Sequence, residues 1–490
     1  MGKYVLSIDQ STQGTKALLF DHIGKLKGRS DLLHKQYVNE FGWVEHDPEE
    51  IYNNVLSTVK NLVQQTGVNR NDIAVLGISN QRETVVVWER ETGKPVYNAI
   101  VWQCARATEI CNKISSSGYS DLIQSRTGIR LSPYFSAAKI AWILQNIDEK
   151  VKKKELCCGT IDSWLIFKLT GGKEFRTDYS NASRTQLLNI HTLAWDEEIC
   201  KIFDIPISYL PEITDSDGEF GMTDFGGYLE QPILIHGVLG DSHGALFGQG
   251  CIEKGMIKTT YGTGSSIMMN IGEKPISSKN VVTSLAWKLN GKIQYVLEGN
   301  INYTGAVVSW LKDNLQLINT SFETEEMAMK ANRDDKTYFI PAFTGLGAPY
   351  WNNYATATLT GMTRITGKNE IVRAGLESIA YQILDILKIM QQEVGEELQE
   401  ICVDGGPTKN MYLMQFQSDI SNLNILVPSE EELSGMGAAY VSGIAIGLYK
   451  MENLFAKMER KRFMPNMSEE KRKEKYEGWK TAVEQVLKIG

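Results

Sequence analysis

The chain has 490 residues, of which 42% are hydrophobic and 22% are charged, and its formal net charge is −8. It is too long for one hydrophobic core, so we expect two or three domains. The acidic balance argues against a nucleic-acid partner, and the most apolar stretch, residues 437–449, is too short and too rich in small residues for membrane insertion.

The turn at residues 9–16 reads Asp-Gln-Ser-Thr-Gln-Gly-Thr-Lys and lies between apolar runs at residues 4–8 and 17–20. This pattern predicts a β-hairpin with a polar tip. The small residues of the tip let backbone N–H groups face an anion. Asp9 adds a carboxylate of the kind that holds hydrated Mg²⁺, and Lys16 adds a cation that attracts phosphate.

The next predicted helix begins at residues 47–50, with Asp as the N-cap, Pro at the first helical position and Glu at the third. Apolar residues recur at helical spacing from there to Gly67. A buried strand over residues 73–78 follows. It ends in the polar turn 79–84, and a second strand over residues 85–88 comes next.

Arg82 and Glu83 lie in that polar turn and offer hydrogen-bond donors beside an acceptor. Such a pair can bracket vicinal hydroxyl groups. Trp102 and Tyr134 could supply an apolar wall against the carbon face of a polyol. The alternatives are a surface ion pair for Arg82 and Glu83 and a core aromatic for Trp102.

Asp241 follows the apolar run at residues 233–239. Open α/β sheets bind ligands at the carboxyl ends of their strands, so Asp9 and Asp241 are the two carboxylates of interest. Asp241 could accept a proton from an attacking hydroxyl while Asp9 organises Mg²⁺ and phosphate. The alternative is a helix N-cap, because an Asp before small residues commonly has that role.

The pattern of the first hairpin returns at residues 256–271, where the turn Gly262-Thr263-Gly264-Ser265-Ser266 separates two apolar runs. Two such hairpins suggest a duplicated domain that clamps one polyphosphate. The alternative is a pair of ordinary β-hairpins. We expect the two halves to abut and hinge, with domains at residues 1–245 and 246–490.

The remaining predicted elements lie in the second half. They are a helix near residues 305–315, a long amphipathic helix from Asn369, a strand at residues 400–403 and a helix of small residues at 435–448. We interpret the basic runs at residues 460–462 and 471–475 as solvated helix faces.

The seven cysteines are odd in number and show no CxxC spacing, which favours a reducing, cytoplasmic location. The chain enters a predicted strand almost at once, so we expect no signal peptide. The six histidines are scattered and form no metal-ligand pattern. Any metal is therefore expected to be Mg²⁺ held by carboxylate and phosphate rather than a built-in zinc ion.

Several longer stretches resemble the FGGY carbohydrate kinases, and within them the glycerol kinases most closely. The resemblance covers essentially the whole chain. It is carried by residues 42–48, 80–84, 93–104, 133–135, 178–185, 344–351, 376–382 and 414–419.

The resemblance implies an α/β fold of two actin-like (ribonuclease H-like) domains, with ATP and substrate in the catalytic cleft between them. It implies transfer of the ATP γ-phosphoryl group to a terminal hydroxyl of a small polyol, with Mg²⁺ as the metal, and a homodimer or homotetramer. Asp241 matches the general base and Asp9 the organiser of Mg²⁺ and phosphate. The positions that correspond to the family's polyol site hold Arg82, Glu83, Trp102, Tyr134, Asp241, Ser242 and Ser266. The positions that correspond to its nucleotide site hold Thr12, Gln13, Gly14, Lys16, Thr263, Gly305, Ser309, Gly406 and Asn410.

The chain departs from the glycerol kinase pattern at four of these positions. Lys16 stands where those enzymes usually have Arg, Ser309 and Ser242 where they have Gln, and Ser266 where they have Phe. Losing an aromatic ring and a long amide from the polyol site should leave a larger and more polar pocket. Such a pocket suits a four- or five-carbon polyol or ketose. Alternatively, neighbouring side chains refill the space and glycerol remains the substrate.

Two other functions are compatible with the hairpins. An actin-like ATP-dependent assembly protein would share the phosphate clamp, but it would not need Arg82, Glu83, Trp102 and Tyr134. A catalytically weak, sugar-sensing relative would be free to lose Asp9, Lys16, Asp241 and Thr263, and the chain retains them all.

Overall fold

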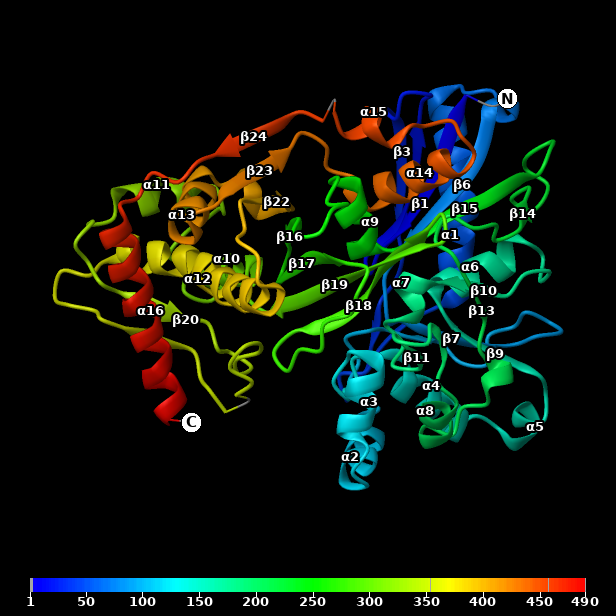
Figure 1. Ribbon diagram of the computed structural model, residues 1–490, viewed down its shortest axis with the longest axis horizontal. Coiled ribbons are helices and arrows are strands. Elements are labelled where there is room, and N and C mark those ends of the chain that lie inside the picture. The colour runs from blue at the N-terminus through cyan, green and yellow to red at the C-terminus, as the bar shows by residue number, and fades with distance from the viewer. Residues whose placement is uncertain (1–2, 353, 457, 490) are drawn as a thin grey trace.

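The computed structural model describes residues 3–352, 354–456 and 458–489. The N-terminal half and the C-terminal half each build their own sheet; in Figure 1 the first sheet lies at the right, and the second runs from the centre of the view towards the left. Within the described residues, no helix is long and apolar enough to cross a membrane.

The first sheet has six strands in the described part of the chain. In spatial order they are β14 (Met222–Thr223), β15 (Ile233–Gly240), β6 (Ile73–Asn80), β1 (Tyr4–Gln10), β2 (Gly14–Phe20) and β3 (Leu26–Leu33). β1 and β15 both run parallel to β6, whereas β2 pairs antiparallel with β1. The first predicted hairpin is therefore confirmed, and the amide of Ser11 closes its tip on the carbonyl of Gly14 at 2.8 Å.

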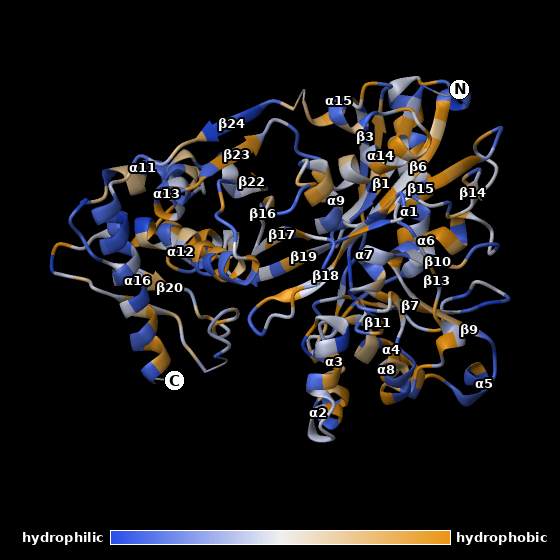
Figure 2. Ribbon diagram, in the orientation of Figure 1, coloured by the Kyte–Doolittle hydropathy of each residue, from blue (hydrophilic) through white to orange (hydrophobic). Residues whose placement is uncertain are grey.

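The second sheet has seven strands among the described residues. Their order is β18 (Val282–Leu289), β19 (Lys292–Ile301), β17 (Ser265–Gly272), β16 (Ile257–Tyr261), β22 (Glu400–Asp404), β23 (Asn424–Pro428) and β24 (Arg460–Phe463). β16 and β17 form the second predicted hairpin, and β22 is the strand expected at residues 400–403. The buried strand β15 consists mostly of hydrophobic residues and is largely orange in Figure 2. The outer helix α16 (Glu469–Ile489) carries both hydrophobic and hydrophilic residues and shows both orange and blue.

A third sheet extends the N-terminal half. It contains β4 (Tyr37–Val38), β5 (Val44–His46), β8 (Ala99–Ile100), β7 (Val85–Glu89) and β9 (Leu156–Thr160). The short strand pairs are β10 (Arg176–Asp178) with β13 (Glu212–Thr214), β11 (Leu188–Asn189) with β12 (Ala194–Trp195), and β20 (Tyr338–Ile340) with β21 (Thr358–Thr360).

Helices connect and cover these sheets. In the N-terminal half they are α1 (Pro48–Thr66), α2 (Thr108–Ser116), α3 (Ser120–Thr127), α4 (Ser136–Asn146), α5 (Glu149–Lys152), α6 (Ile161–Leu169), α7 (Tyr179–Ala182), α8 (Glu197–Ile202) and α9 (Asp241–Gly248). Further along are α10 (Gly305–Asp313), α11 (Glu323–Lys330), α12 (Lys368–Val394), α13 (Met411–Ser421), α14 (Leu433–Ala445), α15 (Met451–Phe455) and α16.

The predicted start of α1 is confirmed in detail. The Asp47 side chain accepts a hydrogen bond from the amide of Glu49, and Gly67 ends the helix with φ +64°. This end geometry suits glycine because a left-handed backbone carries no Cβ penalty there. The helices expected near residues 305–315 and from Asn369 are α10 and α12.

Two details of the C-terminal half differ from expectation. The basic run 460–462 is not a helix face but part of β24, which pairs antiparallel with β23, whereas residues 471–475 do lie on α16. A basic run without apolar periodicity carries no helix signal, and the partner strand decides its conformation. The small-residue helix α14 ends at Ala445, three residues before the predicted end.

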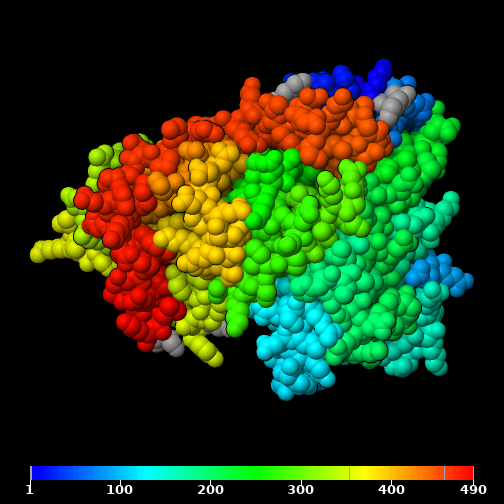
Figure 3. Space-filling view, viewed as in Figure 1, coloured from blue at the N-terminus to red at the C-terminus, as the bar shows by residue number. Residues whose placement is uncertain are grey.

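Helix α14 links the two halves. It lies in the sequence between β23 and β24 of the second sheet but packs on β1, β6 and β15 of the first sheet and against α9. Figure 3 shows the corresponding orange residues lying over the blue N-terminal residues. The approach is close because glycines face each other: a Cβ on Gly437 would lie 1.9 Å from the Gly244 carbonyl oxygen, and one on Gly77 would lie 2.6 Å from that of Ala438.

We expect Gly437→Ala to destabilise the protein by about 2–3 kcal/mol, because the new methyl group would meet backbone that cannot move aside. Urea unfolding of the variant measures the loss. Gly347→Ala is the matched control, since its Cβ would have its nearest neighbour at 3.9 Å. If the two substitutions cost the same, the contact between α14 and α9 is looser than described.

Candidate active site

Three polar strand ends meet at one edge of the first sheet. Asp9 on β1 lies opposite Ser79 on β6, and Gly240 on β15 lies opposite Asn80. Since these strands are parallel, their carboxyl ends share an edge. Asp9, the turn after β6 and Asp241 are therefore neighbours. Burial raises the pKa of Asp9 to about 6; Lys16 offsets part of this, while Glu432 and Asp241 add to it.

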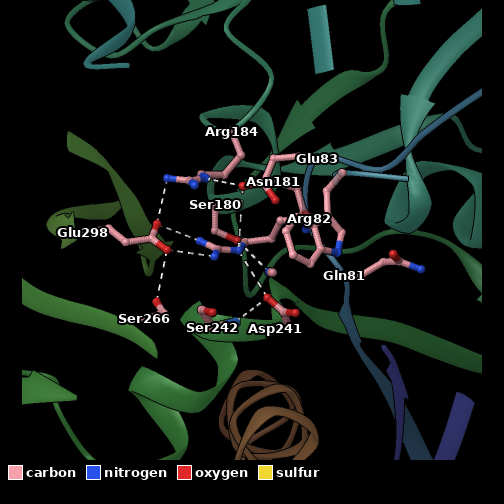
Figure 4. Close-up of polar contacts among 12 residues, drawn as sticks. Gln81, Arg82, Glu83, Ser180, Asn181, Arg184, Asp241, Ser242, Ser266 and Glu298 are labelled. Atoms are coloured by element: carbon pink, nitrogen blue, oxygen red, sulfur yellow. Dashed lines mark hydrogen bonds and ion pairs between the residues drawn. The ribbon is translucent and has the colours of Figure 1, made fainter. Parts of the chain in front are cut away.

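Five charged side chains form a compact ionic cluster at this edge, namely Arg82, Glu83, Arg184, Asp241 and Glu298 (Figure 4). Both Nη atoms of Arg82 donate to Glu298, each at 2.9 Å, and its Nε lies 3.2 Å from Asp241 Oδ1. Arg184 donates from Nε to Glu83 Oε1 at 2.6 Å, and its Nη1 lies 2.7 Å from Glu298 Oε2.

Exposure separates the members of the ionic cluster. The side chain of Asp241 is 36% exposed, whereas those of Arg82 and Glu83 are 6% and 2% exposed. The interpretation of Arg82 and Glu83 as a surface ion pair is therefore wrong: each has its main partner elsewhere, and Arg82 Nε is 4.0 Å from Glu83 Oε1.

Asp241 is the first residue of α9 rather than its N-cap. Gly240 occupies the cap position, and Asp241 Oδ1 accepts the adjacent amide of Ser242 at 2.6 Å. The N-cap alternative is thus wrong. Gly240 also explains the position of Arg82, because a Cβ there would lie 2.7 Å from Cγ and Cδ of the arginine. A glycine lets the arginine stem cross β15 and reach Asp241.

Trp102 and Tyr134 form an aromatic pair beside the first hairpin. Their ring centroids are 5.5 Å apart in an edge-to-face arrangement, and Trp102 Nε1 donates to Thr12 Oγ1 at 2.9 Å. Both residues are half-buried, and Trp102 also packs against the hydrophobic core of the N-terminal half, so the interpretation of Trp102 as a core aromatic is confirmed in part. The pair connects the tip that carries Thr12 to the predicted polyol site.

The two serines of the predicted pocket differ in their partners. Ser266 on β17 donates from Oγ to Glu298 Oε1 at 3.1 Å. In the part of the chain that the structure describes, the Ser242 hydroxyl makes no hydrogen bond, although the residue is half-buried. Ser242 lies beside Asp241 in Figure 4, with Ser266 at the same side of the ionic cluster.

Lys16 does not stand alone at the hairpin. Its Nζ lies 2.7 Å from Glu432 Oε2 and 3.8 Å from Asp9 Oδ2, and Arg29 on β3 pairs with the other oxygen of Glu432. Gln13 at the tip is exposed. Gly14 is required because a Cβ would lie 2.5 Å from the Leu32 carbonyl oxygen.

Most of the predicted nucleotide residues gather around the second hairpin. The amide of Gly305 donates to the Gly262 carbonyl at 2.9 Å, and Thr263 accepts from two amides of the same segment. Gly406 follows Gly405, which has φ +99° and lies so close to Tyr261 that a Cβ would be 2.0 Å from its carbonyl oxygen. These contacts place the α10 start and the loop after β22 on either side of the turn.

Two nucleotide positions stand further out. The Asn410 side chain caps α13 and donates to Thr324 at 3.0 Å, and Ser309 is exposed on α10. Lys16 and Gly406 line a single cavity of about 870 Å³, which also touches Arg29, Asp404 and Glu432. The structure thereby brings the first hairpin and the loop after β22 to one space.

The sequence matches the FGGY family of carbohydrate kinases, N-terminal domain, over residues 4–248 and the C-terminal domain over residues 257–446. The chain belongs to this family.

Individual relatives agree with the family match. Glycerol kinase 1 of Thermotoga maritima is 49% identical over 490 residues, which cover 99% of both chains. The crystal structure of Plasmodium falciparum glycerol kinase with ADP has a TM-score of 0.93 at 40% identity, covering 99% of this chain and 98% of that one. The ligand-bound xylulose kinase of Lactobacillus acidophilus has a TM-score of 0.87 at 24% identity and covers 97% and 96%, which supports the fold alone.

The predicted fold class, two actin-like α/β domains, is thus confirmed, and the chain is a glycerol kinase-like, ATP-dependent carbohydrate kinase. The domain boundary at residue 245 and the roles of individual site residues stay predictions.

Three charged residues of this FGGY kinase site were missed by the sequence reasoning. Arg184 lay within a family-like stretch, residues 178–185, but no role was given to it. Glu298 is one carboxylate in an otherwise apolar segment of β19, and Glu432 closes a run of three Glu residues that resembles a solvated loop. A carboxylate directly after the apolar run Tyr295–Leu297 of β19 was the available signal that Glu298 is buried, but it does not indicate the partner.

Lys139 supports the segment that carries Tyr134 in this kinase. It is buried on α4, and its Nζ donates to the carbonyls of Tyr134 and Phe135, the latter at 3.2 Å. Burial lowers the pKa of Lys139 from its usual 10.5 to about 7, although nearby Glu83 opposes the shift.

We expect the stability of the wild type relative to Lys139→Met to rise between about pH 7 and pH 10, because the unfolded chain binds a proton there that the folded chain does not. Below pH 7 both states are protonated and the difference should be flat. Urea midpoints at pH 6, 7.5 and 9 measure the trend, with the exposed Lys330→Met as the control. A pH-independent difference would contradict the lowered pKa.

Proposed function

We propose that this kinase transfers the γ-phosphoryl group of ATP to a terminal hydroxyl of a small polyol, with Asp241 as the general base. The observation that carries the proposal is the position of Asp241. It is the one half-buried carboxylate, 36% exposed at its side chain, in an ionic cluster whose other described members are buried, and its Oδ1 lies 3.2 Å from Arg82 Nε. A base must reach the substrate hydroxyl, and fixed neighbours keep it oriented.

The other predicted polyol residues have matching chemistry. Arg82 keeps one N–H on each Nη atom after its bonds to Glu298, which suits an oxygen of a hydroxyl group. Trp102 and Tyr134 offer half-buried ring surface for the carbon chain. The names of full-length relatives, glycerol kinases, support a polyol as the acceptor.

The proposed phosphate side uses the two hairpins. Asp9 is a buried carboxylate beside Lys16, and carboxylate oxygens fit Mg²⁺ bound partly through water. The ion would neutralise charge on the transferring phosphoryl group. We assign the nucleotide to Thr12, Gln13, Gly14, Lys16, Thr263, Gly305, Ser309, Gly406 and Asn410. Support comes from the shared cavity of Lys16 and Gly406 and from the similarity to the Plasmodium falciparum glycerol kinase, whose crystal structure is one with ADP.

The size of the polyol is the finer part of the proposal. Ser242 and Ser266 are both half-buried, and Ser242 has a hydroxyl without a partner among the described residues. These two positions favour a four- or five-carbon polyol or ketose over glycerol. Glycerol is the second candidate, favoured by the names of the relatives.

An assembly protein or a weak sugar-sensing relative would show ATP turnover that is indifferent to polyols or nearly absent. The proposed kinase turns over ATP only with a polyol present. A homodimer or homotetramer remains an expectation from the resemblance, and a cytoplasmic location remains an expectation from the cysteine usage.

Asp241→Asn should lower kcat by about 10²–10⁴-fold and leave ATP binding nearly intact, because the proton acceptor is lost while the nucleotide contacts remain. Coupled ADP release and ATP titration measure the two effects. Asp196→Asn, which removes a carboxylate paired with Arg126, is the control. A loss of less than tenfold would leave Asp241 without the role of base.

A panel of glycerol, erythritol, threitol, ribitol, arabitol, xylitol and xylulose should give the highest kcat/KM for a four- or five-carbon compound. Ser266→Phe should then shift the preference towards glycerol by filling the pocket, and Ser266→Ala separates loss of the hydroxyl from gain of the ring. A tenfold preference of the wild type for glycerol, about 1.4 kcal/mol, would show that the serines are neutral replacements.

A further inference from the structure

Glu298 is the centre of the ionic cluster, although it comes from the other half of the chain. It lies on β19 of the second sheet, whereas Arg82, Arg184 and Asp241 belong to the N-terminal half. Its carboxylate accepts three hydrogen bonds, two from Arg82 and one from Ser266, and Arg184 adds an ion pair at 2.7 Å. Two carboxylate oxygens offer about four acceptor sites, so most of the acceptor capacity of Glu298 is in use.

This arrangement fixes the direction of the Arg82 guanidinium. Two parallel bonds to one carboxylate hold its plane, and the same plane then sets the Nε–Asp241 distance and the directions of the two unused N–H groups. The Glu298 side chain is 0% exposed and cannot touch a substrate itself. Burial opposes its ionisation, but Arg184 and Arg82 outweigh burial and hold the pKa of Glu298 well below its usual range.

Glu298 also fixes the polarity of Ser266. A serine hydroxyl has one proton and two lone pairs, and the proton of Ser266 goes to Glu298. What Ser266 can present to the pocket is therefore an acceptor. A substrate hydroxyl at this position has to donate a hydrogen bond to Ser266 Oγ, and a residue without a hydroxyl could not accept that bond.

We propose that Glu298 is the positioning residue of the polyol site, and that through Ser266 it selects a polyol with an additional hydroxyl that donates a hydrogen bond. The inference rests on the proposed function. It goes further because a buried residue of the C-terminal half orients binding residues of the N-terminal half. The polyol site is then complete only when the two halves are in contact.

The competing explanation is that Glu298 only neutralises two buried arginines. Both explanations expect Glu298→Gln to be less stable, so stability does not separate them. Comparing the polyol affinity with the ATP affinity of the variant separates them, because substitution of a merely structural residue would weaken polyol and ATP binding together. Asp335→Asn is a matched control: its carboxylate is 1% exposed and pairs with the buried Arg373 at 3.3 Å in the same half of the chain.

The experiment measures binding of glycerol, erythritol, xylitol and ATP by calorimetry, together with kcat and KM. Glu298→Gln should raise Kd and KM for all three polyols at least tenfold and change those for ATP less than threefold. Asp335→Asn should leave the ratio of polyol to ATP affinity unchanged. An equal loss for polyol and ATP with Glu298→Gln, or no loss for polyol, would overturn the positioning role.

Ser266→Ala and Ser266→Thr test the second part without disturbing the arginines, and they remain informative if Glu298→Gln fails to fold. Alanine should weaken erythritol or xylitol at least tenfold and glycerol less than threefold, and threonine should restore affinity to within threefold of the wild type. Equal effects on all three polyols, or no rescue by threonine, would overturn the selection by Ser266. If polyols bind but are not phosphorylated, the proposed function is refuted, and the affinities of the variants for the polyols and for ATP still test this inference. If no polyol binds, both are refuted.

Discussion

Burying two guanidinium groups and two carboxylates together, with the more exposed Asp241 at their edge, is the constraint on which the site depends. Removing charges from water is costly, and breaking such a cluster by deleting one partner typically costs about 3–5 kcal/mol. The cluster is tolerable only because every guanidinium faces a carboxylate at close range. Its net contribution to stability is small on this argument. Its contribution to geometry is large, since Arg82 and Arg184 each contact two carboxylates and so fix the positions of several groups at once.

The fold supplies that geometry through close backbone contacts at glycines. Gly240 lets the stem of Arg82 cross β15, and the glycines of α14 and α9 let a helix of the C-terminal half lie on the first sheet. The same helix starts at Leu433, directly after Glu432, which reaches Lys16 on the first hairpin. Small residues at the contact and the charged Glu432 before the helix thus bring the two halves to one site.

The sequence predicted the parts of this arrangement that are encoded locally. Both hairpins, the capped start of α1 and the strand-end positions of Asp9, Arg82 and Asp241 follow from alternation, capping residues and polar turns. Glu298 was not predicted, because its partner Arg82 lies 216 residues away in the chain and nothing in β19 itself indicates that contact. The basic run of β24 was misjudged for the same reason, since its pairing with β23 is a tertiary fact.

At the first hairpin, a phosphate that binds Lys16 would have to replace Glu432 as the partner of its ammonium group, because that group is already paired. Lys16 Nζ is 2.7 Å from Glu432, and its side chain is 28% exposed, so the ammonium is reachable but already neutralised. A lysine is a compact point charge on a flexible stem, and it can turn from a carboxylate to a phosphate with little change elsewhere. Glu432 would not be left unpaired by that turn, because Arg29 contacts its other oxygen. The pair of cations around Glu432 therefore allows one of them to leave, which a single ion pair in the same place would not.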